Sequence, residues 1–309
     1  GITADLTSNV GESGNAEGDT YIDIENLTGS EANDKLTGND DANVLTGRAG
    51  ADVLSGLGGI DTASYAGSTT GVIVNLDIGN GTGAGQLGDA DGDTLHDIEN
   101  LTGSDQRDQL FGTAGENIID GAGGFDVMQG YGGDDTYAVD NSLDAVIEAN
   151  GEGFDNVFSS VDYEINEAQE IESAILTGNA TILRGSSSDN QLFGNAAVNV
   201  IDGRGGTDFM LGLGGADIFQ INLEPGATDV VGDFSKAEGD RMAFTGFNPE
   251  TTFVNQASAI SFEVRDTRGT MGDLSDDIVQ TFQLLDSYDP SNQTYTQGAL
   301  VFGVDYYFG

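Results

Sequence analysis

Single apolar residues recur every nine positions in three separate stretches of the chain. Each of them follows an Asp or Asn by two positions and a Gly by seven. A strand of three residues that exposes its outer positions buries only its middle one, so this spacing predicts very short strands joined by loops of about six residues. The predicted buried positions are Leu36, Leu45, Leu54 and Ala63, then Leu110, Ile119, Met128 and Tyr137, then Leu192, Ile201, Met210 and Phe219.

The nine-residue units fall into three blocks, residues 29–64, 103–138 and 185–220. Two units complete one coil of 18 residues, and coils stacked at the ordinary strand spacing of roughly 4.8 Å form a parallel β-solenoid. A longer repeat includes the blocks, because GDTYIDIENLTGS from Gly18 returns 74 residues later as GDTLHDIENLTGS from Gly92. The sequence therefore predicts an all-β fold made of duplicated arrays.

The segments around the blocks have their own patterns. Residues 1–28 form an incomplete lead-in repeat, and we expect the chain to be a piece of a longer array because its opening GITADL echoes GVIVNL from Gly71. Residues 65–102 are predicted to be connecting solenoid turns with an acidic loop, and residues 139–184 connecting strands. Residues 221–309 lack the glycine spacing and hold half of the aromatic residues, which predicts a β-rich C-terminal cap, assembly or secretion domain.

Charge narrows the expected partners. The chain has 9 Lys and Arg against 53 Asp and Glu, a formal net charge of −44. Nucleic acids and anionic membrane surfaces need a basic face, so neither is expected as a partner, and the chain lacks the apolar run of about 18 residues that membrane insertion requires. The absence of cysteine excludes disulfides and thiolate metal sites. A fold this acidic is expected to hold cations between its carboxylates.

The sixth residue of each unit is the candidate metal ligand. Stacking places each loop beside the loop 18 residues later, and two carboxylates that close repel each other unless a cation lies between them. Carboxylates and glycine-loop carbonyls make an all-oxygen cage, which favours Ca²⁺ over Zn²⁺ and fits Mg²⁺ less well. The predicted pairs are Asp34 with Asp52, Asn43 with Asp61, Asp108 with Asp126, Asn117 with Asp135, Asn190 with Asp208, and Asn199 with Asp217.

Two acidic segments outside the blocks are further candidates. Asp89, Asp91 and Asp93 stand at alternate positions, as in an EF-hand loop, but Thr94 and Asn100 replace the turn glycine and the bidentate Glu, so a solvated acidic loop is the alternative. Asp229 and Asp233, with Asp240, are predicted to bind the last ion of the array. Plain capping of the solenoid end is the alternative there.

The units GRAGADVLS at Gly47, GAGGFDVMQ at Gly121 and GLGGADIFQ at Gly212 closely resemble the nonapeptide of the repeats-in-toxin (RTX) family. The resemblance covers residues 1 to about 245 and implies a right-handed parallel β-roll with calcium between successive loops. It also implies type I secretion and folding in extracellular calcium. The first units of each block lack the fourth-position glycine and are expected to be weaker half-sites. The tightest sites are predicted at Asp34 with Asp52 and at Asp108 with Asp126.

No catalytic motif is evident in the sequence. His96 is the single histidine, so a histidine-based zinc site cannot form within the chain, and we predict that it is not an enzyme. Two functions remain open. The first is a secreted structural or adhesive protein, extracellular or on the cell surface, with self-assembly or cell-surface attachment through the C-terminal domain. The second is the calcium-dependent folding and secretion module of a larger exported enzyme, such as a protease, lipase or polysaccharide epimerase. The 74-residue duplication favours the first.

The last residues bear on assembly. ALVFGVDYYFG ends the chain in apolar and aromatic residues. Such a run is either an uncleaved export signal or an edge strand that pairs with a partner.

Overall fold

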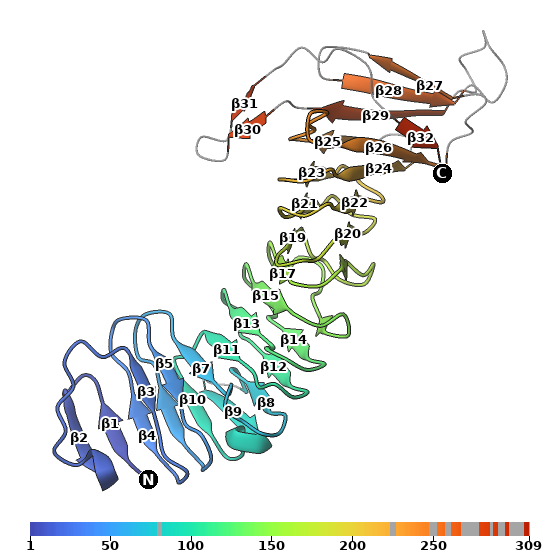
Figure 1. Ribbon diagram of the computed structural model, residues 1–309. Coiled ribbons are helices and arrows are strands. Elements are labelled where there is room, and N and C mark those ends of the chain that lie inside the picture. The colour runs from blue at the N-terminus through green and yellow to red at the C-terminus, as the bar shows by residue number, and fades with distance from the viewer. Residues whose placement is uncertain are drawn as a thin grey trace. The chain divides into compact units, whose positions relative to one another are not determined.

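The computed structural model describes residues 1–78, 82–222 and 227–246 in full, and six further strands between residues 252 and 308 by their backbone. The chain divides into two compact units, Gly1–Val157 and Phe158–Gly309. Apart from the short 3-10 helices η1 (Gly14–Ala16) and η2 (Gly88–Ala90), the regular structure of these residues is β-strand, which confirms the predicted all-β class (Figure 1). In the part of the chain so described, no helix is both long and apolar enough to cross a membrane.

The first unit is a stack of short strands that belong to two sheets. One sheet has the order β2-β1-β4-β6-β10-β9-β8-β12-β14-β16, and the other runs β3-β5-β7-β11-β13-β15 within this unit. The strands of the first sheet are β1 (Thr3–Asp5), β2 (Val10–Ser13), β4 (Lys35–Thr37), β6 (Val53–Ser55), β8 (Ile73–Asn75), β9 (Thr82–Gln86), β10 (Thr94–His96), β12 (Gln109–Phe111), β14 (Val127–Gln129) and β16 (Ala145–Val146). Those of the second are β3 (Asn26–Thr28), β5 (Val44–Thr46), β7 (Thr62–Ser64), β11 (Asn100–Thr102), β13 (Ile118–Asp120) and β15 (Thr136–Val139).

Strands 18 residues apart pair in parallel, as the nine-residue period predicts. Leu36 of β4 lies opposite Leu54 of β6, and Leu110 of β12 lies opposite Met128 of β14. These four side chains are fully buried, whereas their neighbours along each strand are half-buried or exposed. Because each strand contributes one buried residue, the core is a stack of single side chains, and the parallel β-solenoid is confirmed.

One insertion interrupts the parallel stacking. Strand β9 pairs antiparallel with both β8 and β10 and so separates β8 from β10 in the sheet. On the other sheet the stack continues without a gap, since Ala63 of β7 lies opposite Leu101 of β11. The segment predicted as connecting solenoid turns therefore contains an antiparallel strand that the nine-residue pattern does not indicate.

The second unit continues the same construction. One sheet runs β19-β21-β23-β25-β29-β28-β27 within this unit, another runs β18-β20-β22-β24-β26-β32, and β30 pairs with β31. The strand β17 (Asn156–Ser159) includes the boundary between the units. The remaining strands are β18 (Tyr163–Glu164), β19 (Ser173–Leu176), β20 (Ile182–Arg184), β21 (Gln191–Phe193), β22 (Val200–Asp202), β23 (Phe209–Leu211), β24 (Ile218–Asn222), β25 (Thr228–Val231), β26 (Arg241–Thr245), β27 (Thr252–Gln256), β28 (Ser261–Asp266), β29 (Ile278–Leu284), β30 (Ser287–Asp289), β31 (Thr294–Thr296) and β32 (Tyr306–Phe308).

Past the last nonapeptide the pairing changes direction. Strands β27, β28 and β29 form an antiparallel meander, and β29 pairs in parallel with β25 of the coiled array. Strand β32, from the terminal apolar run, pairs in parallel with β26 and is the last strand in the order of its sheet. Residues 297–305 and 309, the rest of that run, lie outside the described residues.

The first-position glycines are needed for close packing rather than for an unusual backbone angle. Gly29 does not have a positive φ, but a Cβ added to it would lie 2.4 Å from Oδ2 of Asp34 and 2.7 Å from the carbonyl oxygen of Gly47. Positive φ occurs at other loop positions, such as the fourth-position Gly50 with φ of 143°. The expectation that glycine marks backbone conformation throughout the loops is thus correct only in part.

Candidate metal centres

The sixth-position residues form hydrogen-bonded stacks, which we call the carboxylate ladders. The backbone N–H of each first-unit residue donates to Oδ1 of the aspartate 18 residues later, and every member is at most 3% exposed. The bonds are Asp34 to Asp52 (2.7 Å), Asn43 to Asp61 (2.8 Å), Asp108 to Asp126 (2.8 Å), Asn117 to Asp135 (2.7 Å), Asn190 to Asp208 (2.9 Å) and Asn199 to Asp217 (2.8 Å). All six predicted pairs are therefore neighbours in the structure.

Each ladder continues into an acidic residue outside the nonapeptides. The N–H of the second aspartate donates in turn to a carboxylate that precedes the next strand of the stack. These bonds are Asp52 to Asp93, Asp61 to Glu99, Asp126 to Asp144, Asp135 to Asp155, Asp208 to Asp229, and Asp217 to Asp240. The sequence analysis missed Glu99, Asp144 and Asp155. A signal was available, because each acid stands two positions before a buried strand residue, as in the nonapeptides.

The first loops of each pair are closed by their own hydrogen bonds, and we call them closed loops. The N–H of the second residue donates to the sixth side chain, as Ser104 does to Oδ2 of Asp108 at 2.6 Å and Thr113 to Oδ1 of Asn117 at 2.7 Å. The Ser104 hydroxyl adds bonds of 3.0 and 3.1 Å to Asp108. Both oxygens of Asp108 therefore already accept protein hydrogen bonds.

Asparagine in a closed loop also uses its amide nitrogen. Nδ2 of Asn199 donates to the carbonyl of Ala180 at 3.1 Å, and Nδ2 of Asn190 donates to that of Ile171 at 2.9 Å. Asn therefore joins its loop to the preceding coil as a neutral donor and acceptor. The predicted ligands Asn43, Asn117, Asn190 and Asn199 all have their Oδ1 occupied by a second- or sixth-position bond of this kind.

The second loops of each pair have the sequence Gly-x-Ala/Gly-Gly-x-Asp and a different backbone, and we call them open loops. Their second residue is left-handed, with φ between 54° and 77°, and their fourth is a glycine with positive φ. The second residues are Arg48, Leu57, Ala122, Tyr131, Arg204 and Leu213. A left-handed conformation costs a non-glycine residue roughly 1–2 kcal/mol, so something must hold the open loop in place.

The open loops of the first unit contain buried carboxylate oxygens that accept no hydrogen bond. These atoms are Oδ2 of Asp52, Asp61, Asp126 and Asp135. The left-handed second residue turns its N–H away from the sixth aspartate; that of Ala122, for example, donates to Asp120. Leaving such an atom without a partner costs about 1–3 kcal/mol, more if it is charged.

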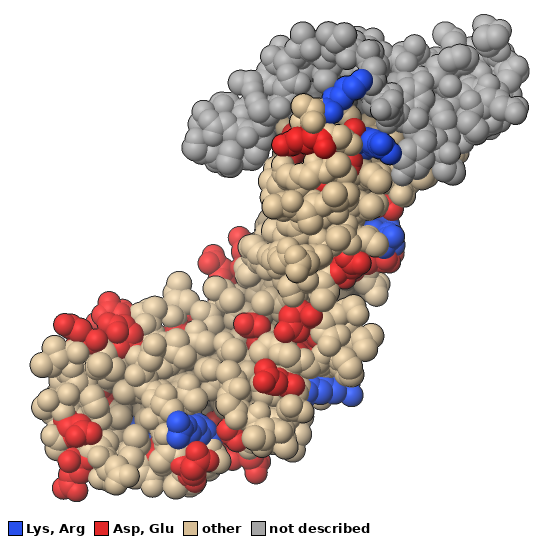
Figure 2. Space-filling view, in the orientation of Figure 1, with Lys and Arg blue, Asp and Glu red and all other residues tan. Residues whose placement is uncertain are grey.

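Burial and neighbouring charge act on these carboxylates in the same direction. Burial first, and then the like charges of the ladder, raise the pKa of Asp61 to about 6 and the pKa values of Asp126, Asp135 and Asp217 to about 7. The same causes raise the pKa of Asp93 to about 7. Acidic side chains also cover much of the surface seen in Figure 2, where basic side chains are few.

The donor set of the loops fits calcium. The open-loop aspartate offers an oxygen without a partner, and the first-position carbonyl of the same loop faces the closed loop, since the Gly121 oxygen lies 2.7 Å from a Cβ placed on Gly103. The loops thus supply carboxylate and carbonyl oxygens without nitrogen or sulfur, which is the set that hard cations such as Ca²⁺ prefer.

The EF-hand-like residues are not brought together as one site. Asp93 is buried and belongs to a ladder, where its Oδ2 also accepts a bond from the Tyr65 hydroxyl at 3.1 Å. Asp91 is exposed, and Asp89 is half-buried at η2. Among the described residues, these three carboxylates do not form a group whose oxygens all lie within 4.8 Å of one another. The chain here follows an antiparallel hairpin, so only Asp93 points into the stack.

The three tail aspartates serve three different loops. Asp229 accepts from Asp208 at 3.3 Å, and Asp240 accepts from Asp217 at 2.9 Å. Asp233 accepts the N–H groups of Gly212 and Leu213 at 2.9 and 2.7 Å. They therefore cover the end of the last open loops, and whether they also bind an ion stays a prediction.

Comparison with known proteins identifies the repeats. The family of the RTX calcium-binding nonapeptide repeat matches the chain in four copies, at residues 28–63, 97–128, 111–141 and 184–219. These matches fall on the three blocks and on the lead-in to the second. None of the curated proteins compared with the chain matches it. The repeats of this family bind several calcium ions per array, and the chain belongs to the proteins built on the RTX calcium-binding nonapeptide repeat.

Proposed function

We propose that the chain is a secreted structural or adhesive protein whose RTX array folds and stiffens when it binds extracellular calcium. The observation that carries this proposal is the set of open-loop oxygens without hydrogen-bond partners, on Asp52, Asp61, Asp126 and Asp135. Each lies in a ladder beside further carboxylates. A bound Ca²⁺ supplies the missing partner and the missing positive charge at once.

Calcium then acts as a condition for folding. Without it, the stack must bury several carboxylates that repel one another, and the core offers only one buried side chain per strand in return. Binding to the folded form alone stabilises that form by mass action. A chain of this kind stays unfolded where calcium is scarce and folds where it is abundant, which supports an extracellular location.

A structural role follows from the way the coils are connected. Each coil contacts the coils directly before and after it, so ions between the loops stiffen the array locally and along its length. The sequence has a single histidine, His96, and it is a half-buried residue of β10 whose carbonyl accepts the N–H of Gly56. These observations support a non-catalytic role for the chain.

The experiment that tests this function is a calcium titration of the metal-free chain followed by circular dichroism, with magnesium as the control. We expect a change from coil to β-structure with calcium and none with magnesium at the same concentration. Full β-structure without either metal would show that the hydrophobic stack alone is sufficient, and the proposal would fail.

A further inference from the structure

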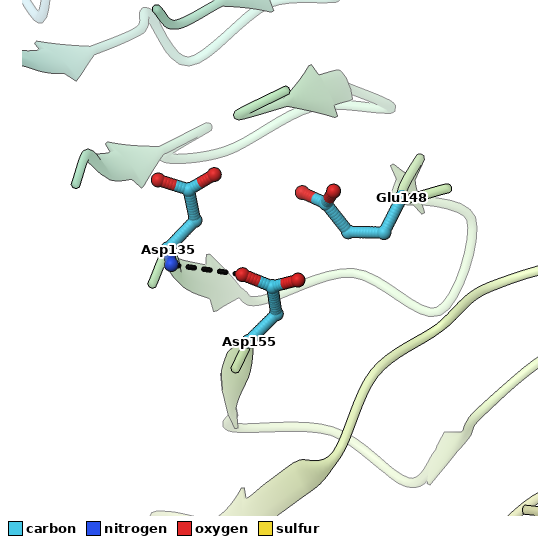
Figure 3. A group of neighbouring side chains, drawn as sticks. All are labelled: Asp135, Glu148 and Asp155. Carbon is cyan, nitrogen blue, oxygen red and sulfur yellow. Dashed lines mark hydrogen bonds between the residues drawn. The ribbon is translucent and has the colours of Figure 1, made fainter. Parts of the chain in front are cut away.

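A cluster of three buried carboxylates lies at the end of the second block, outside the pattern of paired loops. Asp135 is the sixth residue of an open loop, Glu148 follows β16, and Asp155 precedes β17. One oxygen of each lies within 4.8 Å of the others, and the residues are 0%, 3% and 1% exposed. Figure 3 shows the three carboxylate groups facing one shared space.

Hydrogen bonds fix the cluster but leave part of it without partners. Oδ1 of Asp155 accepts the N–H of Asp135 at 2.8 Å, and Oδ1 of Asp135 accepts the N–H of Asn117 at 2.7 Å. The Tyr137 hydroxyl accepts the N–H of Gly130 at 2.6 Å and donates to Oε1 of Glu148. Oδ2 of Asp135 and Oε2 of Glu148 are buried and accept no hydrogen bond.

These two oxygens lack a positive partner as well. A proton on either one would find no acceptor, because neither atom is within hydrogen-bonding distance of another suitable group. Burial and the charges of Asp155 and Asp135 raise the pKa of Glu148 to about 8, which shows how unfavourable three anions are here without a cation. Glu148 is not a nonapeptide residue, so the repeat grammar does not account for it.

We infer that Asp135, Glu148 and Asp155 form a separate calcium site that closes the second block, with Glu148 as the ligand that takes the place of a further nonapeptide loop. The donor atoms are all carboxylate oxygens, which suits Ca²⁺. The site joins the last open loop to the segment from β16 to β17, so the ion fixes the connecting segment as the coils change. This inference rests on the calcium-binding part of the proposed function.

The test counts calcium ions bound per chain by equilibrium dialysis with radioactive calcium, in the full chain and in two variants. Glu148→Gln keeps the shape of the side chain and is expected to lose one ion, or to bind one ion at least about tenfold more weakly, because ligand charge sets affinity. Glu116→Gln removes the same charge from an exposed residue beside Asn117 of the same ladder and is expected to bind as the unchanged chain does.

Equal numbers and affinities in the full chain and Glu148→Gln would overturn the inference and leave the proposed function intact. No calcium binding by the full chain would instead contradict the proposed function. If Glu148→Gln does not fold in calcium, crystals of the unchanged chain grown with terbium decide. An anomalous peak between the three carboxylates supports the site, and peaks at the nonapeptide loops alone overturn it.

Discussion

The backbone N–H of Asp108 donates to Oδ1 of Asp126, 18 residues later, at 2.8 Å, while Oδ2 of the same Asp126 is buried without a hydrogen-bond partner. The two oxygens of one carboxylate thus have different tasks. One holds successive coils in register, and the other is available to a cation. This division separates the effect of a mutation on the fold from its effect on calcium binding.

Replacing Asp126 tests this division directly. Asp126→Asn keeps the acceptor for the Asp108 N–H but removes the charge, so we expect at least one calcium ion to be lost while the metal-free chain keeps its stability. Asp126→Ala also removes the acceptor and is expected to cost about 1–3 kcal/mol in addition. Calcium counting and thermal unfolding measure the two effects.

Asp105→Asn is the matched control, because Asp105 is exposed in the neighbouring closed loop. It is expected to leave both the calcium count and the melting temperature unchanged. An Asp126→Asn chain that keeps its full calcium count would contradict the assignment of the unpartnered oxygen.

The stability of the metal-free chain should fall as pH rises. Asp61 has a folded-state pKa of about 6, and Asp126 and Asp217 have values of about 7, against a model value of 3.8. Between those limits the folded chain binds more protons than the unfolded chain, so the contribution is complete below about pH 4 and is lost as pH rises through 6 to 7. Thermal melting of the metal-stripped chain at pH 5 and pH 8 measures it, with the higher melting temperature expected at pH 5.

Saturating calcium should remove or reverse this trend, because the ion binds the deprotonated carboxylates. The same melting series with excess calcium is the comparison. A metal-free chain that is more stable at pH 8 than at pH 5 would show that the ladder carboxylates are not the dominant titrating groups.

Two fourth-position glycines should respond in opposite ways to alanine. Gly124, in an open loop, has φ of 147°, and an added Cβ would lie 2.4 Å from the Gln106 carbonyl oxygen. Gly115, in a closed loop, has no positive φ, and its Cβ would meet only Oγ1 of Thr113, at 3.7 Å. We expect Gly124→Ala to destabilise the chain by more than about 1–2 kcal/mol, and Gly115→Ala to be neutral or to stabilise it by about 0.4–1 kcal/mol.

Denaturant unfolding in calcium measures both changes. Similar losses at the two positions would mean that open and closed loops do not differ in backbone conformation as the structure has it.

Self-association should depend on the last strand. β32 pairs with β26 and is last in its sheet order, which favours further pairing with another chain. We expect removal of Tyr306–Gly309 to abolish self-association in analytical ultracentrifugation, with the β-structure in calcium retained as the control. Assembly that persists in the shortened chain would rule out this strand as the contact.

The sequence by itself determined the repeating part of the protein. A fixed period of nine residues gives every strand the same length and every loop the same neighbour, so Leu36 opposite Leu54 and Asp34 next to Asp52 follow from counting. The restriction to oxygen ligands also follows from composition, because the chain has no cysteine and one histidine. For these features, local spacing and spatial position are equivalent.

Only the tertiary structure decided what happens where the period breaks. Asp52 meets Asp93, 41 residues later, and Asp61 meets Glu99, 38 residues later, since an antiparallel strand and a lead-in lie between them. The open and closed backbones and the approach of Glu148 to Asp135 likewise depend on packing between coils. A connection of irregular length can follow many paths, and the burial of its few apolar residues selects one, so the partner of an acid there is fixed by the folded chain and not by its spacing.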